Sequence, residues 1–285
     1  AEIQQALDEG TFELLVQPID ELADTAERHG FEVLLMMKDN EGGYVESNAL
    51  FSAAERYRMM PQIDRWVVSN TIARLSELAD KLSGSGVGFA INVSGQSIGD
   101  HDFLEFIEQE LDRSDLPASR LHFEITESAA VSNLNSAQEF IDRLRERGSG
   151  ISLDDFGAGL SSFAYLKSFN VDILKIDGSF IRDITENRIS ESMVFAITQV
   201  AKVMELKTVA EYVETEAARE LITRLGVDFA QGHHIGEPQR LDVVLDELAS
   251  KAKASGKTKG GKKKGGKKKK KKGSKHAGLE AGSES

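Results

Sequence analysis

The sequence predicts an α/β fold: a (β/α)8 barrel of the TIM type, followed by a disordered Lys-rich C-terminal tail. Eight short apolar segments with the pattern of strands alternate with amphipathic helical segments over residues 1–250. Most of these strands also carry an acidic, amide or lysine residue at or near the end, which is typical of the open face of such a barrel. A doubly wound open sheet shows the same alternation and remains an alternative, because periodicity does not reveal whether a sheet closes.

The predicted strands are short apolar or alternating runs bounded by turn residues. They comprise residues 12–19, 30–38, 87–94, 121–128, 150–157, 171–177, 208–214 and 229–235. The link between the first two strands, DELADTAERH, is short and polar and is more typical of a hairpin loop than of a crossover helix. We therefore expect the first strand to run antiparallel to the others.

Two of the intervening segments have clear helical patterns. Residues 61–82 begin with Pro61, which is tolerated in the first turn of a helix because its missing N–H has no partner there. Residues 191–206 have apolar side chains at helical spacing. One face of this second helix is predicted to carry Met193, Ile197, Val200 and Met204.

The charge of the chain changes sign near residue 250. The 285 residues have a net charge of −12, but residues 251–285 contain 14 Lys and two Glu, a net charge of +12. This tail has no apolar periodicity and is predicted to be disordered. Such lysine runs bind polyanions without specificity and also serve as solubilising extensions, so both interpretations stay open. Residues 1–250, with a net charge of −24, are predicted to form one barrel domain.

The composition excludes several classes of protein. The chain contains no Cys, which excludes disulfides and thiolate metal sites. No apolar run approaches the roughly 20 residues that span a bilayer, and no signal peptide is recognisable. We expect a cytoplasmic protein, or the cytosolic part of a larger or membrane-attached one. The chain begins at Ala1 without a Met, as expected of a processed chain or of a piece cut from a longer one.

Asp154 and Asp155 stand side by side at the end of one predicted strand. Adjacent carboxylates repel each other, more strongly when buried, although an isolated pair is also common in turns and at helix N-termini. Similar residues near the ends of other strands are Glu32, Asn92, Glu124, Glu127, Lys175, Asp177, Glu211, Glu214 and Gln231. Such oxygen-rich clusters suit Mg²⁺ or Mn²⁺, and the Asp pair could bridge two cations for phosphoester chemistry.

Seven short motifs resemble those of one family, in the same order along the chain. They are EVL (32–34), NVS (92–94), EITES (124–128), DDFGAGLSS (154–162), KID (175–177), AEYVET (210–215) and QGHHIGEP (231–238). The chain is similar to the EAL domains, bacterial phosphodiesterases acting on cyclic di-GMP, over about residues 3–248. The resemblance implies metal-dependent hydrolysis of cyclic di-GMP to linear pGpG by a two-metal-activated water. It also implies a homodimer and, often, an upstream sensor or GGDEF domain outside this chain.

The resemblance also assigns roles to individual residues. It implies one Mg²⁺ or Mn²⁺ ion held by Glu32, Asn92, Glu124 and Asp154, and a second held by Asp154, Asp155 and Glu211. Lys175, Glu211 and Asp155 are implied to be catalytic, with Lys175 holding or helping to deprotonate the attacking water. The implied substrate-binding residues are Gln17, Leu34, Asp177, Glu214 and Gln231. Glu127 is implied to anchor the loop after Asp155, which couples metal binding to dimerisation in that family.

The chain departs from the family pattern at Val33, Met36 and Tyr212. The family typically reads EALLRW where this chain reads EVLLMM, so that Met36 replaces an Arg that grips a substrate phosphate. Methionine offers no charge, and we expect weaker substrate binding unless another cation, such as Arg56 or Arg182, serves the phosphate. A receptor that binds cyclic di-GMP without turnover is therefore the alternative function. The enzyme is favoured because every acidic ligand position is retained.

Overall fold

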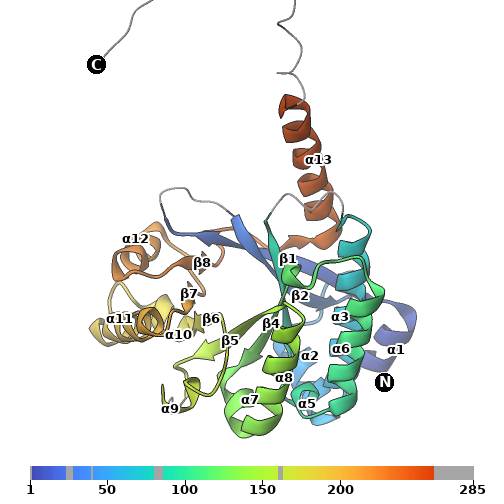
Figure 1. Ribbon diagram of the computed structural model, residues 1–285, viewed down its shortest axis with the longest axis horizontal. Coiled ribbons are helices and arrows are strands. Elements are labelled where there is room, and N and C mark those ends of the chain that lie inside the picture. The colour runs from blue at the N-terminus through green and yellow to red at the C-terminus, as the bar shows by residue number, and fades with distance from the viewer. Residues whose placement is uncertain (1, 24–27, 40, 80–85, 160–162, 260–285) are drawn as a thin grey trace, which may run out of the picture.

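The computed structural model describes residues 2–23, 28–39, 41–79, 86–159 and 163–259. Within these ranges the chain forms a closed barrel of strands with helices packed around it (Figure 1). The eight barrel strands are β1 (Phe12–Glu21), β2 (Arg28–Met37), β3 (Gly88–Val93), β4 (Leu121–Thr126), β5 (Gly150–Phe156), β6 (Ile173–Ile176), β7 (Lys207–Ala210) and β8 (Phe229–Gln231). Each of the eight predicted strands is present, with ends that differ by a few residues.

Strand β1 closes the barrel. Neighbouring strands from β2 to β8 pair in parallel, whereas β1 pairs antiparallel with both β2 and β8. A two-residue strand, β9 (Gln239–Arg240), pairs antiparallel with Leu15 and Val16 of β1. The structure thus confirms the barrel and the reversed first strand, and it excludes the open sheet.

Helices surround the barrel on its outside (Figure 1). They are α1 (Glu2–Glu9), α2 (Ser47–Arg56), α3 (Met60–Ser76), α5 (Gly95–Ile98), α6 (His101–Arg113), the 3-10 helix η1 (Ala118–Arg120), α7 (Glu127–Ser132), α8 (Leu134–Glu146), α9 (Phe163–Leu166), α10 (Gly178–Arg182), α11 (Arg188–Val203), α12 (Glu216–Leu225) and α13 (Leu241–Lys259). The helix predicted over residues 61–82 corresponds to α3, which ends at Ser76, and residues 80–82 of the predicted range lie outside the described residues. The helix predicted over 191–206 corresponds to α11.

Alternation along the strands separates the hydrophobic layer from the barrel interior. In β4, for example, Phe123 is fully buried and its ring packs edge-on against Phe140 of α8, with 6.3 Å between the ring centroids. The next residue, Glu124, lies on the opposite side of the strand and contacts Lys175 of β6 inside the barrel. The outward side chains therefore build the main core. The inward ones include a small apolar cluster of Ile19, Ile173, Val209 and Phe229 as well as the polar residues of the site.

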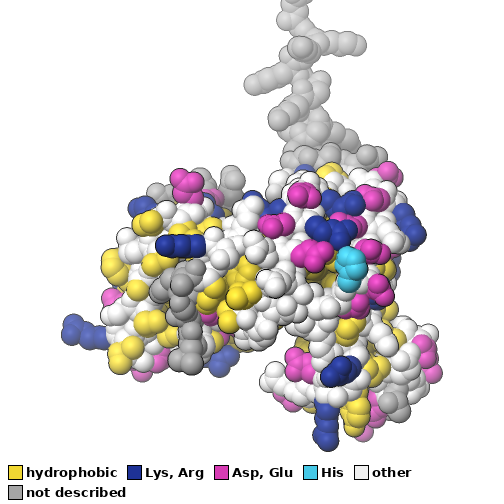
Figure 2. All heavy atoms as spheres, turned by 60° about the horizontal axis from the view of Figure 1, so that its bottom comes forward, with side chains coloured by type: hydrophobic (Ala, Val, Ile, Leu, Met, Phe, Trp, Pro, Cys, Tyr) yellow, Lys and Arg dark blue, Asp and Glu magenta, His cyan; other side chains and the backbone are white. Residues whose placement is uncertain are grey.

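The exposed side of α11 is more apolar than the sequence analysis predicted. Its buried face includes Val194, Ile197 and Ala201, whereas Met193, predicted to share one face with Ile197, is 36% exposed. The helix has apolar residues on both faces, so that spacing alone does not identify the buried one. Exposed apolar side chains on this helix are Ile189, Met193, Phe195 and Val203. Figure 2 shows exposed hydrophobic side chains on the lobe that carries α9 to α12.

The last described helix, α13, continues to Lys259. The domain boundary predicted at residue 250 therefore falls inside this helix, and most of the lysine-rich tail lies beyond the described residues. None of the helices in the described ranges is long and apolar enough to cross a membrane.

Candidate active site

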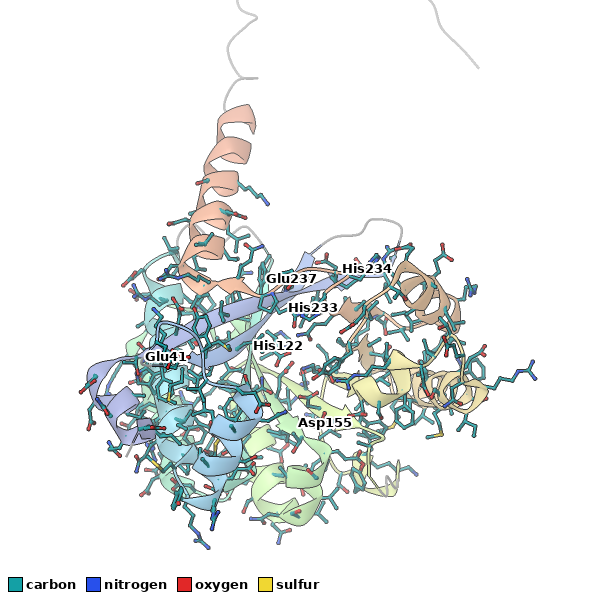
Figure 3. The ribbon with its side chains drawn as sticks, turned by 180° about the vertical axis from the view of Figure 1, so that it is seen from behind. Glu41, His122, Asp155, His233, His234 and Glu237 are labelled. Carbon is teal, nitrogen blue, oxygen red and sulfur yellow. The ribbon has the colours of Figure 1, made fainter. Side chains whose placement is uncertain are left out.

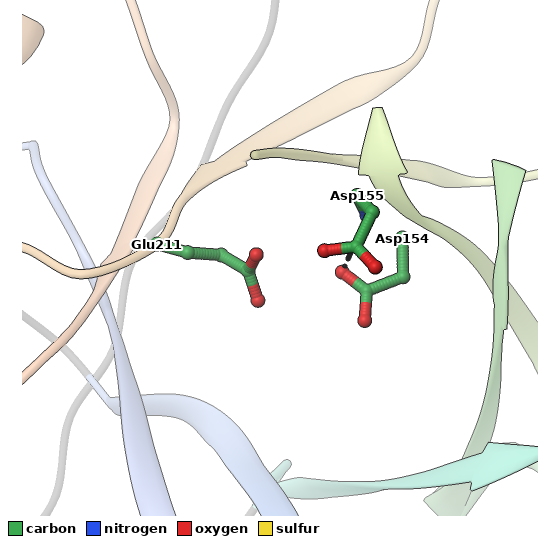
Figure 4. A group of neighbouring side chains, drawn as sticks. All are labelled: Asp154, Asp155 and Glu211. Carbon is green, nitrogen blue, oxygen red and sulfur yellow. Dashed lines mark hydrogen bonds between the residues drawn. The ribbon is translucent and has the colours of Figure 1, made fainter. Parts of the chain in front are cut away.

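The parallel strands bring their polar residues together at one mouth of the barrel, because their carboxyl ends share one face. Asn92 comes from β3, Asp154 from β5 and Lys175 from β6, while Glu211 directly follows β7. Figure 4 shows the carboxylates of Asp154, Asp155 and Glu211 facing one another across this mouth, and one oxygen of each lies within 4.8 Å of the other two.

Lys175 lies at the centre of four carboxylates. Its Nζ is 2.6 Å from Glu124, 2.9 Å from Glu211, 3.1 Å from Glu32 and 3.4 Å from Asp154. The side chain is 1% exposed. Burial by itself lowers the pKa of Lys175, but the surrounding carboxylates outweigh burial and hold this pKa well above its usual value. The ammonium group is therefore firmly protonated in this arrangement.

Two amides orient Glu32. Asn92 Nδ2 donates a 2.6 Å hydrogen bond to Glu32 Oε1, and Gln231 Nε2 donates a 2.7 Å bond to Glu32 Oε2. Burial raises the pKa of Glu32, but Lys175 and these two amides outweigh it, so that the pKa lies below its usual value. Glu32 is thus held ionised, as a metal ligand must be.

The carboxylates around Lys175 carry more negative charge than its single positive charge balances. Burial, reinforced by neighbouring carboxylates, raises the pKa of Glu211 to about 8 and that of Asp155 to about 6. It also raises the pKa of Glu124 well above its usual value, despite Lys175. Five carboxylates against one ammonium leave a formal charge of −4, which two divalent cations would balance. These oxygen donors fit hard cations such as Mg²⁺ or Mn²⁺.

A bulge in β5 brings the two adjacent aspartates to the same side. In a regular strand, Asp154 and Asp155 would point in opposite directions. Here the pairing of β5 with β6 shifts register between Leu153 and Phe156, and Asp155 adopts a left-handed φ of 52°. This conformation costs a non-glycine residue about 1–2 kcal/mol and aims both carboxylates into the mouth. Both carboxylates therefore line the mouth of the barrel, and the bridging of two cations by this pair stays a prediction.

The carboxylate of Glu127, at the start of α7, accepts hydrogen bonds from residues at both ends of the segment that follows Asp155. Its carboxylate accepts a 2.9 Å hydrogen bond from the backbone N–H of Gly157 and another from the hydroxyl of Tyr165. Residues 160–162, between these contacts, lie outside the described ranges. The role of Glu127 as a loop anchor stays a prediction, and Tyr165 is a partner that the motifs did not reveal.

A cavity of about 380 Å³ opens above the carboxylates. It is lined by Gln17, Glu32, Leu34, Asp154, Asp155, Glu211, Tyr212, Glu214, Gln231, Gly232, His233 and Pro238. The lining includes four of the five predicted substrate-binding residues. The fifth, Asp177, instead caps α10 by accepting a 2.9 Å hydrogen bond from Ser179 N, and its charge helps to raise the pKa of Asp155.

The motif QGHHIGEP also contributes His233 to the cavity lining, a residue to which the sequence analysis gave no role. Figure 3 shows His233, His234 and Glu237 together on the segment after β8. Only His233 of these three lines the cavity, with its Nδ1 3.7 Å from Glu214. His234 instead contacts Glu216 at 2.7 Å. One sequence signal could have indicated that these residues lie near the site: they come directly after the strand that carries Gln231.

Met36 lies outside the lining of this cavity. It follows Glu32 by four residues on β2, and its Sδ accepts a 3.9 Å contact from Ser47 Oγ at the start of α2. The strand register places it opposite Glu13 of β1. Of the two alternative cations, Arg56 ends α2, whereas Arg182 lies over the ring of Tyr212, which does line the cavity.

Comparison with known proteins gives consistent matches along the chain. The family model for the EAL domain matches residues 1–238. The cyclic di-GMP phosphodiesterase PdeF of Escherichia coli (strain K12) is 37% identical over 246 residues, which cover 86% of this chain and 32% of PdeF. The cyclic di-GMP phosphodiesterase PdeB of Shewanella oneidensis is 35% identical over 249 residues, covering 87% of this chain and 29% of PdeB. The chain thus spans about a third of the length of these curated relatives.

Solved structures share the same fold. The PaMucR phosphodiesterase in complex with c-di-GMP superposes with a TM-score of 0.80 at 31% identity, covering 85% of this chain and 98% of that chain. The FimX EAL domain from Pseudomonas aeruginosa bound to c-di-GMP gives a TM-score of 0.76 at 27% identity, covering 83% and 94%. The barrel with its reversed first strand, the acidic mouth and these matches lead to one assignment. The chain belongs to the EAL domain family.

Proposed function

We propose that the chain is a metal-dependent phosphodiesterase that hydrolyses cyclic di-GMP to linear pGpG. The observation that carries this proposal is the ring of carboxylates around Lys175 at the barrel mouth, which has the charge and donor atoms for two hard cations. The relatives PdeF and PdeB are named cyclic di-GMP phosphodiesterases, and the PaMucR structure contains the same nucleotide.

The roles proposed for the site residues are those that the family resemblance implies, and the charges and positions of these residues are compatible with them. Glu32, Asn92, Glu124 and Asp154 would hold one cation, and Asp154, Asp155 and Glu211 the other. Bound Mg²⁺ or Mn²⁺ would neutralise the phosphate and lower the pKa of a water. Lys175, held protonated by its neighbours, would orient the attacking water and stabilise negative charge on the phosphate. Attack of water on phosphorus breaks one bond to a ribose 3′ oxygen, and the opened ring is pGpG.

A receptor that binds cyclic di-GMP without turnover is the alternative function. Such a receptor has no need for a crowded cluster of buried carboxylates, in which burial, reinforced by Asp154 and Glu32, raises the pKa of Glu211 to about 8. The complete ligand set therefore supports the enzyme. The lack of a positively charged side chain at position 36 affects the affinity for cyclic di-GMP and not the hydrolysis step.

Product analysis tests the proposal directly. The protein is incubated with cyclic di-GMP and Mg²⁺ or Mn²⁺, and the nucleotides are separated by chromatography. Formation of pGpG with the metal, and its loss on chelation with EDTA, supports the phosphodiesterase. Binding of cyclic di-GMP by calorimetry without any product, at high protein concentration with either metal, supports the receptor instead.

We further propose that the protein forms a homodimer through α11. Four apolar side chains, Ile189, Met193, Phe195 and Val203, are exposed on this helix, and exposed apolar surface of this kind favours association. A second copy of the chain would bury this surface. Sedimentation analysis of wild type and of Phe195→Glu tests this: a dimer that becomes a monomer supports the proposal, and a wild-type monomer contradicts it.

A further inference from the structure

Tyr212 gives the acidic cavity an aromatic wall. It directly follows Glu211, lines the cavity and remains 49% exposed. Among the described residues of the lining, only His233 also carries an aromatic ring. An exposed aromatic side chain in a site otherwise dominated by carboxylates is unusual, because it contributes neither to cation binding nor to the hydrophobic core.

The backbone of Tyr212 is held in a strained conformation. Its φ of 54° is left-handed, a region that favours glycine. The next residue, Val213, is fixed on both sides: its N–H donates to Gln231 O at 2.9 Å, and its carbonyl accepts from His234 N at 3.1 Å. Strain of this kind persists only where surrounding contacts enforce it, and it concentrates at functional sites.

The ring itself is also fixed in place. The guanidinium carbon of Arg182 lies 4.2 Å from the centroid of the Tyr212 ring, a cation–π contact. On α10, Gly178 leaves the necessary space, since a Cβ atom there would lie 2.1 Å from Cδ2 of the ring. The result is a rigid aromatic surface beside the catalytic cluster, held by a cation for which the described residues provide no ion pair.

We propose that one purine base of the nucleotide substrate stacks on the Tyr212 ring, and that Arg182 positions this ring. The inference rests on the proposed function, because it assumes a nucleotide in the cavity. An uncharged flat surface suits a base better than a phosphate, which needs cations in so acidic a site. Stacking on an aromatic side chain strengthens binding by roughly five- to 150-fold per base and does not depend on which base is stacked.

Substitution of Tyr212 in the 285-residue chain tests the stacking. Tyr212→Asn removes the ring, and Asn tolerates the left-handed backbone. We expect this variant to raise KM for cyclic di-GMP roughly tenfold and to change kcat by less than about twofold, because stacking serves ground and transition states alike. Tyr212→Phe, which keeps the ring, restores the wild-type KM. Tyr57→Asn, at an exposed tyrosine outside the cavity lining, is the matched control.

Direct binding separates this inference from the proposed function. The affinity for cyclic di-GMP is measured by calorimetry with Ca²⁺, which takes the same oxygen ligands, and Mn²⁺ affinity is measured alongside. Equal nucleotide affinity of wild type and Tyr212→Asn overturns the stacking while leaving the phosphodiesterase intact. A tenfold loss with unchanged Mn²⁺ affinity supports it. A wild type that neither binds nor hydrolyses the nucleotide overturns the proposed function itself.

A double-mutant cycle tests the role of Arg182. If Arg182 acts by holding the ring, Arg182→Ala raises KM only while Tyr212 is present and adds nothing to Tyr212→Asn. Arg182→Lys keeps the cation and recovers part of the loss. Fully additive effects of Arg182→Ala and Tyr212→Asn would show that Arg182 contacts the substrate by itself, which contradicts a positioning role.

Discussion

The ammonium group of Lys175 on β6 donates a 2.6 Å hydrogen bond to the carboxylate of Glu124 on β4, and both side chains are buried in the barrel. Three further carboxylates lie within 3.4 Å of the same nitrogen. Lys175 is therefore the counter-ion that holds the cluster together when no metal is bound. Removing it would leave several buried charges that repel each other.

Lys175→Met should destabilise the metal-free protein by about 3–5 kcal/mol near pH 8, the cost of leaving buried charges unpaired. Urea unfolding measures this free energy. Added Mn²⁺ should stabilise the variant more than the wild type, because cations take over the lost charge. Lys207→Met is the control, since Lys207 pairs with Asp228 at 2.7 Å but is 62% exposed, so that its loss should cost less than about 1 kcal/mol. Equal losses in the two variants would contradict the counter-ion role.

Metal binding should strengthen as the pH rises from 6 to 8. The pKa of Asp155 is raised to about 6 and that of Glu211 to about 8, mainly by burial. Protons must leave these carboxylates before a cation can bind, so binding should release protons in this range. Calorimetric titration with Mn²⁺, in buffers of different ionisation enthalpy, measures both quantities. A pH-independent affinity would show that the two carboxylates are not ligands.

The same shifts determine how the stability of the metal-free protein depends on pH. The pKa of Glu211 is raised on folding, so between its usual value and about 8 the folded state binds more protons than the unfolded state. The free energy of unfolding therefore falls as the pH rises through this window. Saturating Mn²⁺ should flatten the decline, and thermal unfolding at several pH values with and without the metal tests it.

Asp154→Asn should abolish hydrolysis and weaken metal binding while the barrel stays folded. Burial and the neighbouring Glu32 raise the pKa of Asp154 despite Lys175, so removing its charge relieves repulsion and should raise the metal-free Tm by about 2–4 °C per kcal/mol gained. Asp228→Asn should do the opposite to stability, because Asp228 accepts hydrogen bonds from Thr208 and Lys207. Full activity of Asp154→Asn would remove the two-metal assignment.

The sequence predicted the barrel well because strand alternation is a local pattern, whereas the metal-ligand set stays a prediction. Strand alternation places Glu124 inside and Phe123 outside whatever the surroundings. It could not predict that Asp155 faces the same side as Asp154, because this depends on a bulge set by pairing with β6. Nor could it select the buried face of α11, where Met193 is exposed, because only packing against the barrel distinguishes two apolar faces.

Deletion of residues 260–285 should leave hydrolysis of cyclic di-GMP nearly unchanged. The deleted part contains ten lysines, and the cut follows the end of α13 at Lys259, so that no described element is interrupted. Binding to vesicles with anionic lipid should weaken, more clearly at low salt. Replacing the lysines by glutamine within the intact chain is the matched control. A large loss of kcat in the shortened protein would instead show that the tail acts on the barrel.

Met36→Arg should tighten substrate binding. By alternation, residue 36 lies on the same face of β2 as Glu32, which reaches the cluster through Lys175. An arginine there has two candidate partners: a substrate phosphate, or Glu13, which lies opposite Met36 in the strand register. Glu13 already contacts Arg240 at 2.8 Å, so we expect the new guanidinium to turn to the phosphate. Met36→Gln, which adds polarity without charge, is the control.

A charge-assisted contact of this kind should lower KM roughly tenfold. The change in kcat should be small if the contact is made equally in the ground and transition states, and the gain should shrink at high salt if the arginine stays partly exposed. Steady-state kinetics at two ionic strengths measure both effects. If Glu13 captures the arginine, the gain appears only when Met36→Arg is combined with Glu13→Gln. An unchanged KM in both proteins at low salt would mean that other groups hold the phosphate, and that the methionine at this position has no bearing on affinity.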